Sequence, residues 1–164
     1  GQVVCSHEMS VFLAGRGVEA VGMNTGGTFE AAGIKLTMVR ADHTGGITLT
    51  GGDADATREV GCWGWILEFE DGTRVYHSGD TDLFGDMALV RERYSPTIAV
   101  LPIGGHYTMG PDGAARAVGL LEVQTVLPVH FGTFPALAGR PDQLQQQVSA
   151  GVVRLQPGET WEAS

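Results

Sequence analysis

The chain has 164 residues, with 19 acidic and 10 basic side chains and a net charge of −9. This length suits one domain with one core, and the acidic charge repels phosphate backbones, so we expect no nucleic-acid partner. Apolar residues make up 43% of the chain, as in globular rather than disordered proteins. No apolar run approaches the ~20 residues of a membrane span and no signal peptide stands out, so we expect a cytoplasmic protein that binds no membrane.

The first sixty residues predict short strands, one helix and a long loop. Ser6 has the residue type of a helix N-cap, apolar residues follow it at helical spacing, and Gly15 ends the helix. The predicted strands are Val3–Cys5, Val18–Val21 and Gly33–Val39, with a turn over Met23–Gly27. The stretch Ile47–Glu59 is polar and rich in small residues, which predicts a loop.

The rest of the chain predicts a sheet covered by helices. Asp71-Gly72 is a strong hairpin signal between the strands Cys62–Glu70 and Thr73–His77. Strands and helices then alternate, which is typical of an α/β layer fold. The predicted helices are Asp86–Tyr94, Pro111–Leu121 and Pro141–Ala150. The predicted strands are Thr97–Ile103, Thr125–Val129 and Val152–Leu155, with a final edge over Thr160–Ala163.

Polar side chains stand just beyond the ends of four predicted strands: His43, Asp80, His106 and His130. Ligands bind at strand ends in α/β sheets because several loops converge there. Imidazoles with a carboxylate are the ligands of hydrolytic zinc or manganese sites. Each residue taken singly is more typical of packing or of a turn, whereas for the set a metal site and this ordinary structural role are equally good interpretations. The two cysteines, Cys5 and Cys62, match neither a metal-binding spacing nor a disulfide framework.

Five segments carry motifs of one known family. They are Gly22–Gly27, His43–Thr44, Tyr76–Thr81, Leu101–Pro111 and Leu127–Pro135. In this order, and over essentially the whole chain, they resemble the metallo-β-lactamase superfamily, in its branch of uncharacterised metal-dependent hydrolases near the L-ascorbate-6-phosphate lactonases. The resemblance implies an α/β fold of four layers, an αββα sandwich. Residues 1–164 then form a single domain that is the C-terminal, larger part of this sandwich.

The resemblance also implies a role for each polar strand end. His43 completes the histidine set of a first metal, Asp80 bridges two metals, and His130 binds the second. His106 lies near the metals as a substrate-facing or oxyanion-stabilising group rather than as a ligand. Either His106 or backbone N–H groups of its glycine-rich loop help one metal to stabilise the oxyanion. The implied cofactor is a pair of divalent metal ions, two Zn²⁺ or else Mn²⁺, Ni²⁺ or Fe²⁺.

The implied reaction is hydrolysis of a small-molecule substrate. A metal-bound hydroxide attacks an ester, lactone, amide or phosphoester centre. Asp80 and His106 are then the residues that act in catalysis. Thr81 and Thr108 either orient the ligands or cap turns.

One superfamily signature, His-x-His-x-Asp-His, has no counterpart, because no segment contains two histidines two residues apart. Each metal would be under-coordinated by the remaining ligands. We expect that a segment before Gly1 supplies the others, that a separate chain does, or that they are lost. Exposed sheet edges would then pair with that segment, or with a second copy of the chain in a homo-oligomer. The alternative functions are a non-catalytic binding or assembly module with this fold and, with less support, a nucleotide-binding domain, since no phosphate-loop motif is present.

Overall fold

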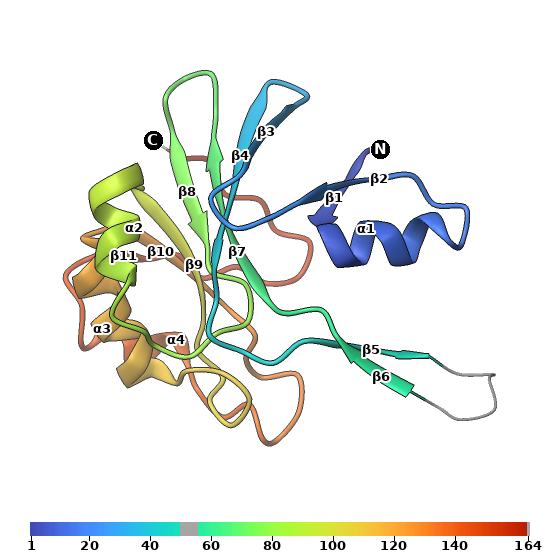
Figure 1. Ribbon diagram of the computed structural model, residues 1–164. Coiled ribbons are helices and arrows are strands. Elements are labelled where there is room, and N and C mark those ends of the chain that lie inside the picture. The colour runs from blue at the N-terminus through green and yellow to red at the C-terminus, as the bar shows by residue number, and fades with distance from the viewer. Residues whose placement is uncertain (50–55, 164) are drawn as a thin grey trace.

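A seven-stranded mixed sheet dominates the computed structural model of the chain (Figure 1), which describes residues 1–49 and 56–163. The strand order is β11-β10-β9-β8-β7-β4-β3. In that order the bounds are Gly151–Val152, Thr125–Val129, Ile98–Pro102, Arg74–His77, Trp63–Glu68, Ile34–Arg40 and Thr28–Ala31. Strands β8 to β11 are parallel, whereas β3, β4 and β7 pair antiparallel with their neighbours, and β7 is also antiparallel to β8.

Three helices cover one face of this sheet: α2 (Met87–Tyr94), α3 (Pro111–Leu121) and α4 (Pro141–Gln145) (Figure 1). Helix α3 buries Ala114, Ala117, Val118 and Leu121, at the spacing of one helical face. The core lies between these helices and the sheet, where Tyr76, Leu101 and Val126 are fully buried. The prediction of a sheet covered by helices is confirmed.

A separate unit lies on the other side of the sheet and consists of β1 (Val3–Ser6), α1 (His7–Ala14) and β2 (Ala20–Met23) (Figure 1). Its two strands are parallel. The Ser6 hydroxyl accepts a hydrogen bond from the Met9 N–H at 3.3 Å, so the predicted N-cap is confirmed. A cavity of about 300 Å³ separates Val4 of β1 from apolar side chains of β4 and β7.

The loop predicted over Ile47–Glu59 is wrong at both of its ends. β5 (Gly46–Leu49) and β6 (Ala56–Glu59) form an antiparallel pair, and residues 50–55 lie outside the described residues. This pair leaves the large sheet (Figure 1). Ile47 and Leu49 do alternate with Thr48 in β5, but β6 reads Ala-Thr-Arg-Glu and shows no such alternation, so the polar, small composition of the whole stretch hid the strand pair. Strand β3, which only pairs with β4 at the sheet edge, was also missed.

Several predicted boundaries also need correction. The strand predicted over Val18–Val21 runs instead over Ala20–Met23, so Met23 ends a strand and the turn follows it. Helix α4 stops five residues early, because the Gln145 side chain bonds the backbone of Ala150 and of Val152 and turns the chain into β11. As a result β11 begins one residue before the predicted strand and ends at Val152. Residues 160–163 form no strand.

Candidate metal centre

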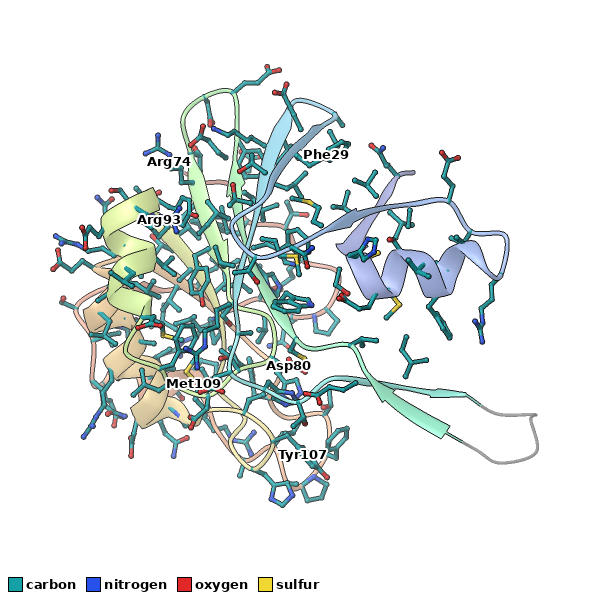
Figure 2. All side chains as sticks on the ribbon, in the orientation of Figure 1. Phe29, Arg74, Asp80, Arg93, Tyr107 and Met109 are labelled. Atoms are coloured by element: carbon teal, nitrogen blue, oxygen red, sulfur yellow. The ribbon has the colours of Figure 1, made fainter. Side chains whose placement is uncertain are left out.

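The four predicted site residues follow strands that end at the same edge of the large sheet. β8, β9 and β10 are parallel and are followed by Asp80, His106 and His130. β4, which precedes His43, is antiparallel to β7, and β7 is antiparallel to β8, so β4 runs in the same direction as β8. Figure 2 shows Asp80, Met109 and Tyr107 at this edge. The topology therefore explains why residues far apart in sequence come near one another.

Asp80 and His130 form the closest pair among these residues. Oδ2 of Asp80 lies 3.6 Å from Nε2 of His130, beyond hydrogen-bond distance. Within the described residues, the buried Nδ1 atom of His130 also has no hydrogen-bond partner. Two ligands of one tetrahedral ion, each bound at ~2.0–2.2 Å, are separated by roughly 3.3–3.6 Å. The pair therefore has the spacing of two donors to a shared metal ion.

The His43 ring lies beside two backbone carbonyl groups and not beside Asp80 or His130. Its Nε2 atom is 3.0 Å from the carbonyl oxygen of Tyr107, and its Nδ1 atom contacts the carbonyl oxygen of Thr44. Carbonyl oxygens only accept, and a neutral imidazole has one N–H to donate, so one of these contacts is not a hydrogen bond in the neutral ring. Over residues 1–49 and 56–163, no three His, Cys, Asp or Glu side chains gather closely enough to hold one metal ion.

The structure adds Cys62, which the sequence analysis did not place in the site. Its Sγ atom lies 3.6 Å from Nδ1 of His43 and 3.5 Å from the carbonyl oxygen of Thr44. Burial raises the pKa of the Cys62 thiol, and the negative charge of Asp80 raises this pKa further. Cys62 therefore contacts His43 and lies close enough to Asp80 for that carboxylate to influence its thiol. The sequence predicted that Cys62 begins a strand, but it did not show that this strand pairs with the one that leads to His43.

The loop 104–110 connects the segments that carry the predicted ligands. A side chain at Gly104 would lie 2.2 Å from the carbonyl oxygen of His130, so the two backbones pack directly together. The Tyr107 carbonyl oxygen lies 3.0 Å from Nε2 of His43, and the Met109 N–H donates to the Thr81 carbonyl at 3.1 Å. This loop therefore fixes the positions of three segments at once.

His106 lies at the exposed tip of that loop. Its backbone is left-handed, with φ 60°, and its ring packs edge-on against Tyr107 with centroids 4.4 Å apart. The side chain is accessible to a molecule that approaches from solvent. Its role toward substrate stays a prediction.

Thr81 is fully buried and joins two site segments. Its hydroxyl accepts from the Asp42 N–H at 2.9 Å and donates to the Asp82 carbonyl at 2.7 Å. It therefore ties the chain before His43 to the chain after Asp80. Thr108 contacts only the neighbouring Met109 carbonyl among the described residues, at 3.4 Å.

Comparison with known proteins places this arrangement in a family. The profile described as Beta-lactamase superfamily domain matches residues 1–131. The chain belongs to this superfamily. The metallo-β-lactamase resemblance and fold predicted from the sequence are confirmed. The solved structure of Igni18, a metallo hydrolase from Ignicoccus hospitalis, has a TM-score of 0.80 and 34% identity, and the match covers 100% of this chain and 70% of that one.

Curated relatives of the chain are named UPF0173 metal-dependent hydrolases. One from Koribacter versatilis is 45% identical over 162 residues, or 98% of this chain and 68% of the relative. One from Methanocaldococcus jannaschii is 51% identical over 137 residues, or 82% of this chain and 58% of the relative. The chain thus spans about three fifths to two thirds of the length of these superfamily members. No helix that the structure describes is long and apolar enough to cross a bilayer.

Proposed function

We propose that this superfamily member contributes to the metal centre of a hydrolase that binds two divalent cations. The observation that carries the proposal is the 3.6 Å separation of Asp80 Oδ2 and His130 Nε2, two metal-binding donors that face each other without a hydrogen bond. The printed names of the relatives, metal-dependent hydrolases, support the same function.

Three side chains of this chain would hold the cations. His130 and Asp80 would hold one ion and His43 the other, and the Asp80 carboxylate would serve both. Nitrogen and carboxylate donors suit zinc and also manganese, nickel and iron, and we propose zinc as the resident ion. Bound cations supply Lewis acidity and make a nucleophile available from water at neutral pH.

The exposed His106 side chain faces the substrate in this proposal. Negative charge develops on the substrate oxygen when an ester, lactone, amide or phosphoester is attacked, and a positioned donor stabilises it. The N–H groups of Gly105 and Tyr107 already donate within the loop, to the carbonyls of Met109 and Gly105. These two N–H groups are therefore engaged, and we propose the exposed His106 imidazole as the donor to the substrate oxygen.

Chelation tests the proposal directly. We expect the full polypeptide to hydrolyse at least one generic ester, lactone or phosphodiester, to lose turnover after dialysis against a chelator, and to regain it with added Zn²⁺ or Mn²⁺. The measurement is initial rate together with metal content. Turnover that chelation leaves unchanged contradicts a metal-dependent reaction. Neither metal uptake nor turnover is the result expected of a non-catalytic assembly module.

A further inference from the structure

A cavity of about 520 Å³ lies between helix α1 and the β5–β6 pair (Figure 1). Val11 and Phe12 line it from α1, and Ile47 and Val60 line it from the strand pair and the residue that follows β6. Helix α1 buries none of its residues, and Val11 is 60% exposed. Small-molecule pockets measure about 300–1,000 Å³ and have mainly apolar walls. The cavity therefore has the size and lining that suit an apolar ligand group.

The cavity adjoins the candidate metal centre. The N–H groups of Val60 and Gly61 donate to the Gly45 carbonyl, at 2.9 and 3.3 Å, and close the base of the β5–β6 pair. His43 and Cys62 contact each other just beyond this base. Val60 precedes Cys62 by two residues, which span at most about 7 Å. A substrate whose reacting bond lies at the candidate metal centre can thus extend an apolar group into the cavity.

The charged side chains of the cavity disfavour an anionic group. Its polar lining consists of His7, Glu8, Arg16 and Glu59. The Arg16 guanidinium stacks 3.6 Å from the centroid of the Phe12 ring, and its Nη1 atom donates to the Phe12 carbonyl at 3.3 Å. This cation is therefore engaged with its own helix, whereas two carboxylates repel an incoming anion. A neutral apolar group fits the cavity better than a phosphate or a carboxylate does.

We propose that this cavity binds the apolar acyl chain or ring substituent of an uncharged ester or lactone. The inference rests on the proposed hydrolase and narrows its substrate class. In the reaction water adds across the acyl C–O bond, with the hydroxyl going to the carbonyl carbon and the proton to the leaving oxygen. Burial of an apolar group away from the reacting bond supplies binding energy that raises kcat/KM.

A series of 4-nitrophenyl esters tests the cavity in the full polypeptide loaded with Zn²⁺. We expect kcat/KM to rise from the acetate through the butyrate and hexanoate to the octanoate, by up to about fourfold for each methylene that becomes fully buried. The mono-4-nitrophenyl ester of suberic acid has the chain length of the octanoate and ends in a carboxylate. Its kcat/KM should be at least about tenfold below that of the octanoate, because the charge would enter the cavity.

Val11→Asp, which places a carboxylate on the cavity wall, should remove the dependence of kcat/KM on chain length. Because Val11 is 60% exposed, this change leaves the core intact. Val18→Asp is the matched control, since Val18 is also exposed, at 41%, follows the same helix and lies outside the cavity lining. It should keep the wild-type dependence. Ester turnover that is independent of chain length in the wild type, or a Val11→Asp series as steep as the wild-type one, overturns this inference and leaves the hydrolase in place.

Binding without turnover separates the cavity from the proposed function. We expect 1-octanol to shift the methyl NMR signals of Val11, Ile47 and Val60 in the full polypeptide without added metal, and to leave those of Val18 unchanged. These shifts in a protein that hydrolyses no ester would overturn the proposed function and keep the cavity as an apolar binding site. Unshifted signals overturn the cavity, and a second copy of the chain seated on it would give this result together with a dimer in analytical ultracentrifugation.

Discussion

Replacing Asp80 with Ala should lower the hydrolytic turnover of the full polypeptide by more than about a hundredfold, because even the outer-shell partners of metal ligands are worth 10–100-fold. The Asp80 carboxylate lies 3.6 Å from the His130 imidazole, and its charge is felt by the Cys62 thiol. Its removal takes away the carboxylate donor that faces His130. The measurement is kcat with metal content determined on the same sample.

Asp82 provides the matched control, because it is an exposed carboxylate two residues further along the same loop. Its backbone N–H donates to the Asp42 carbonyl at 3.0 Å, a bond that alanine keeps. Asp82→Ala should therefore retain metal and turnover. Asp80→Asn, which keeps the shape and removes the charge, should resemble Asp80→Ala. Wild-type turnover in Asp80→Ala would refute the role of this carboxylate.

The second large effect is expected at Gly104, where the loop 104–110 packs against the backbone of His130. A Cβ atom there would lie 2.2 Å from the His130 carbonyl oxygen and 3.1 Å from the Leu137 side chain. Overpacking of a tight interior costs about 1–3 kcal/mol and sometimes more, and a backbone oxygen yields less than a side chain, so we expect Gly104→Ala to lose about 3 kcal/mol. To make room for the added Cβ atom, the backbone of His130 must move, so metal affinity should fall as well.

Urea denaturation measures the first effect and metal titration the second. Gly119→Ala in helix α3 is the control, since a Cβ atom there meets nothing within 4 Å. Alanine is a better helix former than glycine, so this variant should gain up to about 1 kcal/mol. A Gly104→Ala protein as stable as the wild type, with unchanged metal affinity, would show that this contact does not position His130.

The approach of the site segments to one sheet edge follows from patterns visible in the sequence. Continuous apolar runs before His106 and His130 predict buried strands, and the helix between them predicts that these strands are parallel. Parallel strands bring their carboxyl ends to one edge, which is where the structure places both residues. The hairpin signal at Asp71-Gly72 likewise gave the antiparallel β7–β8 pair.

The contacts within the site depend on information that the sequence pattern does not contain. The neighbour of His43 is decided by the pairing of β4 with β7, two strands separated in the chain by β5 and β6. A single cysteine without a partner at metal-binding spacing gives no signal of this pairing. The 3.6 Å approach of Asp80 to His130 depends in turn on how the loop 104–110 packs against the His130 backbone.

Divalent cations bound at the ends of β4, β8 and β10 are the central requirement of the proposed hydrolase. The most direct measurement is a crystal structure of the zinc-loaded full polypeptide, with the ions located by anomalous scattering. We predict one ion bonded to both Asp80 and His130 and a second bonded to His43. Anomalous peaks that lie elsewhere, with these three side chains left unbound, would contradict this prediction.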